Sequence, residues 1–560
     1  MTPLTPRATW ALALGLGVVA RLAGQELANK TPIDLPEFAV FADRALPPPE
    51  RWFYSRIEGF EVLSNASERS TLRLLTEFQR FSHALSLVWP GMQADNTVPA
   101  ALIVCGSERK FEEFLPDDLR PAERATTSLT FRKGEQGAIV LDHQTKILSL
   151  ISAEGVAAAS AAADPAGFEV DSTQQLYRAY ISFLLAGREV APPPWFAEGL
   201  SQLFTNLRIT ETEISVGRIE NPNLAASGDR DFNAALAQRA LMPMAELFAV
   251  TAESITAQSP LNSDWAKQCY AFVHWGLYGG YGRHQKGFVT FVARLGREPL
   301  TEVLFQECFK LTYTEMLFEL RTHIEFTRTK FAGVRAGKGQ KIPEPPAFTV
   351  REATEAEIGR LKGDTLMLAG NATAARAALL DAYRRGAREA GLLAAFGLSE
   401  LVTGEPARAR KLLEAAVASN AVRPRAYVEL ARLRLAEGLA LPAGGNGRLS
   451  LEQTARVLEP LFTARAQTPA LPEVYDLIAA TWEACSVAPG AAHLEVIEEG
   501  VRKFPRTPAL VYRAAELRAK GGFVSEAHGL VRLGLRVATD AAMRAKFEQL
   551  AASLPPLAAR

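Results

Sequence analysis

The sequence predicts an α+β module over residues 51–331, followed by an all-α solenoid over residues 350–560. Two observations predict this division. Before residue 331, strand-like apolar runs alternate with amphipathic helical patterns, and after residue 350 a glycine recurs every 34 residues among Ala- and Leu-rich segments. The Gly-, Lys- and Pro-rich stretch 332–349 between them is expected to be a linker. A chain of 560 residues is also too long for one compact core.

The N-terminus resembles a secretory signal. Arg7 precedes an apolar stretch over residues 10–20, and small residues allow a cut near Ala23 or Gly24. Arg21 makes the cleavage site poor, so an uncleaved anchor stays open, although the stretch is short for a membrane span. We expect residues 1–24 to be a signal peptide or anchor and residues 25–50 a linker. We also expect export to the periplasm or inner membrane of a bacterium, with membrane contact only through this segment.

The first half of the α+β module reads as strands and helices in alternation. A strand is expected over residues 60–63, and an amphipathic helix over residues 68–88 buries one face. The residues of that face are Leu72, Leu75, Phe78, Phe81 and Leu85. A buried strand over 98–104, a short helix over 108–114 and a strand over 138–141 follow. The alanine-rich residues 150–170 are expected to form a loop.

Two further helices follow. Apolar residues at helical spacing after Ser172 predict a helix that ends near Gly187 and the Ala-Pro-Pro-Pro run at 191–194. The segment Pro194-Trp-Phe-Ala-Glu-Gly-Leu-Ser-Gln-Leu-Phe204 then predicts a second helix packed on the first.

These two segments resemble the active site of peptidase-MA-like metallopeptidases, a gluzincin-type group. In that group a helix reading H-E-x-x-H-x-L-L is followed by P-x-W-x-x-E-G-L-A-x-x-F. The resemblance places Glu198 on the third zinc ligand, Arg178 on the first histidine, Ala179 on the general base and Ser182 on the second histidine. It implies a gluzincin-like fold for the module, with a degenerate metal motif.

The chemistry of the substituted residues excludes the usual zinc site. A catalytic zinc takes about three ligands with lone pairs, and a neighbouring carboxylate takes the proton of the metal-bound water. The guanidinium of Arg178 has no lone pair, Ala179 has no titratable group, and Ser182 is a weak neutral donor. We therefore expect no catalytic residue, metal or other cofactor here. Arg178 and Glu198 either form a buried ion pair in place of the metal or are both solvated.

An active peptidase with atypical ligands would need replacements from elsewhere. None of the seven histidines forms an H-x-x-x-H or H-x-H pair. His143 follows a strand-like run, His274 lies in an aromatic helix-like run typical of a packed core histidine, and Glu189 is the nearest candidate base. The four cysteines form no C-x-x-C motif. A Cys269–Cys308 disulfide is conceivable, but buried free thiols are favoured.

The rest of the module is expected to be mainly helical. Alternation over residues 209–219 predicts a hairpin at the edge of the cleft, and the polar residues 220–235 predict an exposed loop. Helices are expected over residues 263–282, 284–295, 298–309 and 312–330.

The solenoid prediction depends on a repeat of 34 residues. Gly370, Gly404 and Gly438 have this spacing, and three small or apolar residues recur with it: Ala375 with Ala409, Leu379 with Leu413, and Ala382 with Ala416. The period and the small packing residues resemble tetratricopeptide (TPR) repeats. An insertion over residues 439–449 interrupts the array, and Gly522 and Ala527 match the turn and packing positions further on. A generic alanine-rich helical bundle is the alternative.

Three functions remain open. The first is an exported pseudoenzyme that acts as a scaffold, with protein or peptide partners bound by the TPR-like repeats. The second is a peptide- or glycan-binding module that uses the old cleft, and the third is an active zinc peptidase with atypical ligands. Because 62 basic residues balance 62 acidic residues and no basic block occurs, we expect no nucleic-acid partner.

Overall fold

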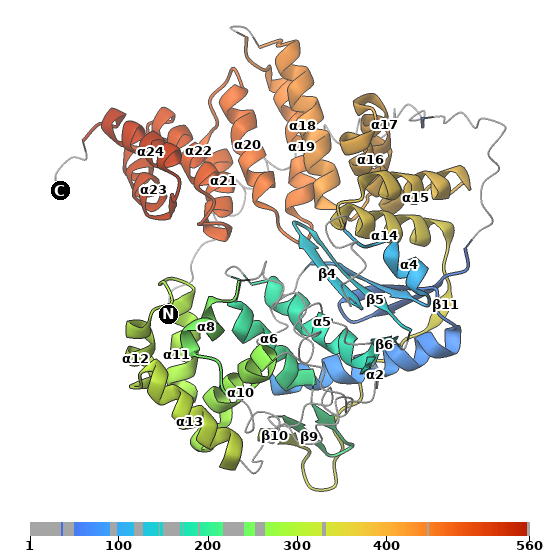
Figure 1. Cartoon of the computed structure of the whole chain (residues 1–560). Coiled ribbons are helices and arrows are strands. Elements are labelled where there is room, and N and C mark those ends of the chain that lie inside the picture. The colour runs from blue at the N-terminus through green and yellow to red at the C-terminus, as the bar shows by residue number, and fades with distance from the viewer. Residues whose placement is uncertain are drawn as a thin grey trace, which may run out of the picture. The chain divides into compact units, whose positions relative to one another are not determined.

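The computed structural model describes most of the chain and divides it into two compact units (Figure 1). One unit spans 46–387 with 464–475, and the other contains 388–463 and 476–560. The described residues are 35–36, 50–89, 98–116, 127–144, 146–148, 168–170, 172–188, 191–205, 207–216, 240–251, 264–326, 332–444 and 447–556. The expected signal or anchor and nearly all of the 25–50 linker lie outside them. No helix in the described part is long and apolar enough to span a bilayer.

A six-stranded mixed sheet organises the first unit. Its strands run in the order β11-β1-β2-β3-β5-β4, with β2, β3 and β5 parallel and the other neighbours antiparallel. Every residue of β3, Ala-Ala-Leu-Ile-Val-Cys, is buried, as expected for a central strand covered on both faces. The bounds are β1 Phe53–Ile57, β2 Phe60–Ser64, β3 Ala100–Cys105, β4 Ser128–Lys133, β5 Gln136–Asp142 and β11 Val350–Glu352.

The two faces of this sheet are covered by different helices (Figure 1). Alternate strand residues point to opposite faces. Leu102, Val104 and Ile139 therefore pack in one apolar cluster with α2 (Glu68–Val88) and α5 (Ser172–Ala186). Ile103 and Val140 pack in another cluster that includes residues of α4 (Glu108–Glu112), α14 (Glu355–Leu368) and α15 (Ala372–Arg384).

Helix α2 has the predicted bounds. Ser67 caps its N-terminus by accepting a hydrogen bond from the backbone N–H of Ser70. Four residues of the predicted apolar face are buried, but Leu72 is 47% exposed. The apolar face predicted from the sequence therefore includes one residue, Leu72, that the structure leaves exposed.

A helical lobe follows the sheet in the same unit and has an aromatic core. Trp195 is fully buried and contacts five phenylalanine rings: Phe196, Phe248, Phe272, Phe288 and Phe291. The helices are α6 Pro194–Thr205, α8 Met244–Ala249, α10 Asp264–Tyr278, α11 Gln285–Leu295, α12 Glu302–Phe309 and α13 Tyr313–Phe326, with the 3₁₀ helix η4 Gly279–Gly282.

Two small sheets complete this unit. One has the order β10-β9-β8 and is antiparallel, and the other pairs β6 with β7. The expected hairpin is formed by β8 and β9, whereas β10 comes from residues expected to be a linker. The bounds are β6 Lys146–Leu148, β7 Phe168–Val170, β8 Arg208–Ile209, β9 Glu213–Val216 and β10 Ala332–Arg335.

The 34-residue repeat corresponds to two helix pairs with the same internal packing. In the pair α14–α15, a Cβ on Gly363 would lie 2.5 Å from Leu379 Cγ. In the pair α16 (Ala390–Thr403) and α17 (Pro406–Ala418), a Cβ on Gly397 would lie 2.8 Å from Leu413 Cγ. Both leucines and both matched alanines, Ala375 and Ala409, are fully buried. Each pair therefore needs a glycine where its helices approach most closely.

The repeat is less regular beyond the second pair. Gly370, with a φ of +84°, lies in the turn of the first pair, but Gly438 is inside helix α18 rather than in a turn. Gly522, with a φ of +82°, does lie in a turn, and Ala527 is fully buried, as expected. The remaining helices are α18 Pro424–Ala440, α19 Leu451–Arg465, α20 Pro472–Ala484, α21 Ala491–Lys503, α22 Pro508–Lys520, α23 Val524–Val537 and α24 Ala541–Ser553.

The two helix pairs that share the repeat belong to different compact units. α14 and α15 lie in the unit of the six-stranded sheet, while α16 and α17 lie in the other. The first pair is joined to the sheet through β11, which pairs with β1, and through Leu361 and Leu366, which are buried with strand residues. The repeat in the sequence therefore begins before the end of the first compact unit.

Candidate functional site

The candidate site lies where α5 and α6 pack together. α5 buries Leu176, Ile181 and Phe183 in the apolar cluster that it shares with the main sheet and the helical lobe. Pro194 is the first residue of α6. Proline suits this position because the backbone N–H of the first helical residue makes no hydrogen bond within the helix. The arrangement brings Arg178 of α5 next to Glu198 of α6.

Arg178 and Glu198 form a buried ion pair. Nη2 of Arg178 lies 2.8 Å from Oε1 and 2.7 Å from Oε2 of Glu198, and the two residues are 9% and 8% exposed. Gln202, one helical turn after Glu198, donates from Nε2 to Oε1 at 2.7 Å. The carboxylate thus accepts three short hydrogen bonds, so its buried charge is compensated. Of the two arrangements that the sequence left open, the structure has the buried ion pair.

The other two substituted positions supply no metal ligand. Ala179 is buried in the apolar cluster, and Ser182 is exposed on α5. Within the described ranges, no three His, Cys, Asp or Glu side chains gather closely enough to hold a metal ion. The residues around Glu198 therefore suit a cation of their own chain rather than zinc.

Close packing against α10 fixes the position of Glu198. A Cβ on Gly199 would lie 2.4 Å from Val273 Cγ2 and 2.7 Å from the carbonyl oxygen of Cys269, so only glycine allows this approach. Burial, with a smaller effect from the charge of Glu198, raises the pKa of the Cys269 thiol well above its usual value. The sulfur facing this site is therefore an inert thiol. Cys269 and Cys308 are both free.

His143 contributes to a different hydrogen-bond network. Its Nε2 lies 2.7 Å from Ser70 Oγ, and its Nδ1 lies 3.0 Å from Ser172 Oγ. The imidazole thereby links the end of β5 to the first turns of α2 and α5. Glu189, the candidate base, lies outside the described residues.

His274 is packed in the helical lobe, as its aromatic surroundings predict. Its Nδ1 lies 2.9 Å from Nε2 of His323 in α13, and both residues are buried. Burial, with further effects from the facing His274 and His284, lowers the pKa of His323 from 6.5 to about 3. His323 is therefore neutral, and the contact between the two rings lies in the helical lobe, away from Glu198.

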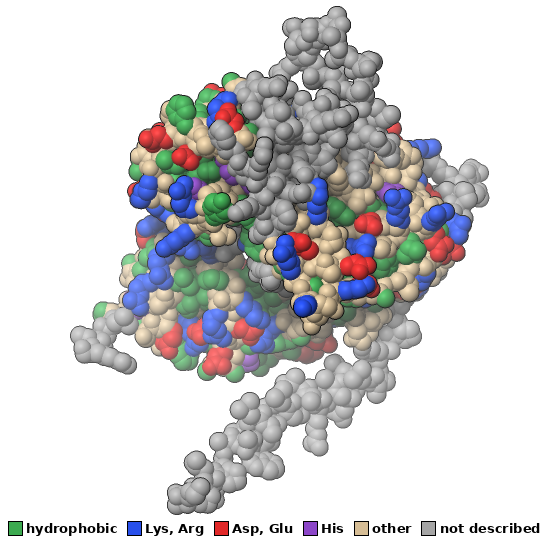
Figure 2. Space-filling view, turned by 90° about the horizontal axis from the view of Figure 1, so that it is seen from below, with side chains coloured by type: hydrophobic (Ala, Val, Ile, Leu, Met, Phe, Trp, Pro, Cys, Tyr) green, Lys and Arg blue, Asp and Glu red, His purple; other side chains and the backbone are tan. Residues whose placement is uncertain are grey.

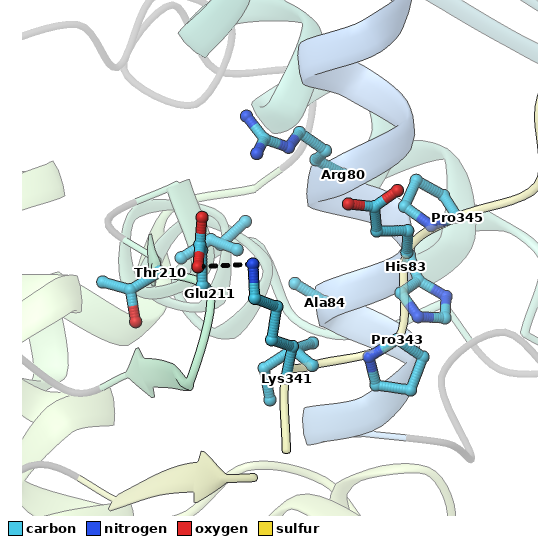
Figure 3. Close-up of a pocket in the computed structure, with 11 residues that line it drawn as sticks. Arg80, His83, Ala84, Thr210, Glu211, Lys341, Pro343 and Pro345 are labelled. Atoms are coloured by element: carbon cyan, nitrogen blue, oxygen red, sulfur yellow. Dashed lines mark ion pairs between the residues drawn. The ribbon is translucent and has the colours of Figure 1, made fainter. Parts of the chain in front are cut away.

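The sequence did not reveal a cavity of about 270 Å³ in the same unit (Figure 3). Its walls come from three segments: residues 80–84 of α2, residues 209–211 at the β8–β9 turn, and residues 341–345 after β10. Figure 3 shows Lys341 pointing toward Glu211, and their Nζ and Oε2 atoms lie 2.9 Å apart. No local sequence signal could have found this cavity, because its segments are far apart in the chain.

The charge distribution on the surface matches the balanced composition. On the face shown in Figure 2, basic and acidic side chains of the described residues are interleaved with apolar ones and form no single large field of one sign.

Comparison with protein-family models gives no match. Comparison with curated proteins gives no significant match. Three similar solved structures are Pseudomonas aeruginosa pilF, the thermophilic TPR protein TTC0263 of Thermus thermophilus, and YrrB, a TPR protein with an unusual peptide-binding site. Their identities are 17%, 16% and 13% and their TM-scores 0.28, 0.26 and 0.27. The matched regions make up 36%, 35% and 34% of this chain. They make up 88%, 99% and 91% of the three similar chains. At these values the likeness assigns neither a fold nor a ligand to this chain.

Proposed function

We propose that this chain is an exported, non-catalytic metallopeptidase-like protein that binds protein or peptide partners through TPR-like repeats. The observation that carries the first part is the buried pair of Arg178 and Glu198. These residues occupy the positions that the metallopeptidase resemblance gives to a zinc-binding histidine and to the third zinc ligand.

The pair explains how a metallopeptidase-like module could persist without metal. A buried carboxylate needs a cation, because an isolated charge in the interior costs several kcal/mol. In the resembling enzymes zinc would supply that cation, and here Arg178 supplies it. Gln202 adds a further hydrogen bond to the same carboxylate. With Arg178 in place of the metal, α5 and α6 stay packed together, but no metal is left to bind the nucleophilic water.

The repeat region supports the binding role. Helix pairs that stack on one another leave a long surface whose side chains are not needed for packing, and solenoid proteins use such surfaces to bind other proteins. The two pairs α14–α15 and α16–α17 pack by the same Gly–Leu contact at an interval of 34 residues. This regularity favours a repeat array over an unrelated helical bundle.

The experiment is reconstruction of the metal site. The triple variant Arg178→His, Ala179→Glu and Ser182→His restores two imidazoles at i and i+4 of α5, with Glu198 as third ligand. We expect the wild-type chain, purified with zinc supplied, to contain no stoichiometric zinc by mass spectrometry. We expect the triple variant to bind about one zinc per chain and to gain melting temperature when zinc is added.

Two controls make the result specific. The triple variant with Glu198→Gln added should lose most of the zinc affinity, because the third ligand is removed. Stoichiometric zinc in the wild-type chain would overturn the proposal outright. A triple variant that folds but binds zinc no better than the wild-type chain would overturn the metallopeptidase-like geometry.

Export is tested separately by fractionating bacteria that express the full chain. Recovery in the periplasm or the inner membrane supports this part, and recovery only in the cytosol contradicts it. Replacing Trp10–Ala20 by a polar sequence should abolish export.

A second candidate function is peptide or glycan binding at the edge of the old cleft. The observation that favours it is β8, a short edge strand whose two residues are exposed. An extended peptide can add to such an edge by main-chain hydrogen bonds. A proline at Ile209 would remove a backbone donor there and should weaken peptide binding without unfolding the unit.

A further inference from the structure

Both charged and apolar side chains line the cavity beside β8 (Figure 3). Ala84 of α2 is almost fully buried, and Ile209, Ile342, Pro343 and Pro345 complete the apolar part. All of these residues belong to one compact unit, so the walls are fixed relative to one another. A volume of about 270 Å³ suits a ligand smaller than a typical drug molecule.

The charged residues of the lining balance one another. Arg80 and Lys341 are positive, and Glu211 and Glu344 are negative. The hydrogen bond and charge of Lys341, with a smaller effect from Arg80, lower the pKa of Glu211. Glu211 and, more weakly, Glu344 raise the pKa of Lys341. Glu211 thus interacts with both cations of the lining and Lys341 with both anions, and a ligand of one sign would leave the opposite pair unmatched.

The ion pair already present is easily exchanged. The side chains of Lys341 and Glu211 are 70% and 72% exposed, and an ion pair so open to water contributes little to stability. Arg80 contacts Glu77 at a distance of 3.8 Å, which is long for an ion pair. A ligand that brings both a carboxylate and an ammonium group can replace the Lys341–Glu211 contact by two charge-assisted ones.

His83 also contributes to the lining. Nε2 of His83 is buried and has no hydrogen-bond partner among the described residues. The ring therefore contributes its exposed atoms, not this nitrogen, to the cavity. His83 belongs to the same turn of α2 as Arg80 and Ala84 and is part of the lining.

We propose that this cavity binds a zwitterionic ligand of the amino-acid type with an apolar side chain. Arg80 and Lys341 hold the carboxylate, Glu211 and Glu344 hold the ammonium group, and the side chain packs on Ala84, Ile342 and the prolines. The ligand is a free amino acid or a dipeptide, which share this chemistry. The inference is independent of the fate of the zinc site.

The test is isothermal titration calorimetry on the full chain with four probes: L-leucine, leucinamide, N-acetyl-leucine and the dipeptide Leu-Leu. Leucinamide lacks the carboxylate, and N-acetyl-leucine lacks the ammonium group. We expect leucine or Leu-Leu to bind and each blocked analogue to bind at least about tenfold more weakly, as loss of one charge-assisted contact predicts. Tighter binding of Leu-Leu than of leucine identifies a dipeptide as the ligand.

Variants locate the binding. Lys341→Gln should weaken leucine binding at least about tenfold and remove the preference over leucinamide, and Glu211→Gln should remove the preference over N-acetyl-leucine. Lys338→Gln, an exposed residue outside the cavity, is the matched control and should bind as the wild-type chain does. The proposal is overturned if neither zwitterion binds at millimolar concentration, if the blocked analogues bind equally well, or if Lys341→Gln and Glu211→Gln leave binding unchanged.

Discussion

Arg178 and Glu198 are 20 residues apart in the sequence, yet one guanidinium nitrogen of Arg178 lies within 2.8 Å of both carboxylate oxygens of Glu198. The pair joins helices α5 and α6 in the interior of the first unit. Its energetics follow from burial, because each partner keeps the other from being an uncompensated interior charge.

Breaking this pair on one side should cost more than removing it altogether. Arg178→Met leaves Glu198 buried and unpaired, so we expect a loss of about 3–5 kcal/mol in the free energy of unfolding. The double variant Arg178→Met with Glu198→Leu should recover most of that loss. About 1 kcal/mol should remain lost, because Gln202 then lacks its hydrogen-bond acceptor. Urea denaturation of the two variants measures the difference. Equal losses in both would show that Glu198 is solvated.

The stability of the first unit should fall as the pH is lowered below 6.5. Burial keeps His323 neutral in the folded state, where its pKa is about 3 against an ordinary 6.5. The unfolded chain therefore binds a proton first, and stability is lost progressively between these two pH values. Above pH 6.5 this group contributes no pH dependence.

The slope should approach about 1.4 kcal/mol per pH unit for this one group. Denaturant unfolding at several pH values measures it, and His323→Gln should flatten the curve. A positive charge on the neighbouring His274 or His284 opposes protonation of this ring, which keeps the pKa of His323 low. A wild-type slope that His323→Gln does not change would refute this assignment.

The repeat packing predicts opposite effects for two glycine substitutions in the second unit. Gly397→Ala places a Cβ 2.8 Å from Leu413 Cγ and 3.2 Å from its backbone nitrogen, so we expect a loss of about 1–3 kcal/mol. Gly529→Ala, in helix α23, meets nothing within 4 Å and should stabilise by about 0.5–1 kcal/mol. Thermal unfolding compares the two. A neutral Gly397→Ala would mean that α16 and α17 are not held by this contact.

The cysteines should differ in reactivity in the folded chain. Cys269 is fully buried with a raised thiol pKa, whereas Cys308 is half-buried. Reaction with a maleimide under native conditions, followed by peptide mass mapping, should label Cys308 well before Cys269. Urea should remove the difference. Early labelling of Cys269 would contradict the close packing of α10 against α6 at this position.

Several elements could be predicted because their signals are local. Helix α2 has apolar residues at helical spacing and a serine cap, and its bounds match the prediction. The Arg178–Glu198 pair was one of two alternatives, and it could be considered only because the metallopeptidase resemblance assigns both residues to one site. The matches of Ala375 with Ala409 and Leu379 with Leu413 indicated buried helix contacts, which the structure contains.

Two kinds of strand were missed: short strands of mixed composition, and strands whose partners are far away in the sequence. β1 and β4 are short strands, β4 at the sheet edge, and their mixed polar and apolar residues give no strong strand signal. β10 and β11 lie in or next to a Gly- and Pro-rich stretch, and only pairing with β9 and β1 makes them strands. The cavity near Lys341 was missed for the same reason, since composition alone describes residues 341–345 as linker.

The position of β11 has a consequence for biosynthesis. A ribosome that has translated residue 349 has made five of the six strands of the main sheet, and the sixth, β11, is still missing beside β1. The apolar face that α14 later covers is then also bare. We infer that the nascent first unit cannot complete its core until about 40 further residues have emerged. Until then, the incomplete sheet is open to binding by a chaperone.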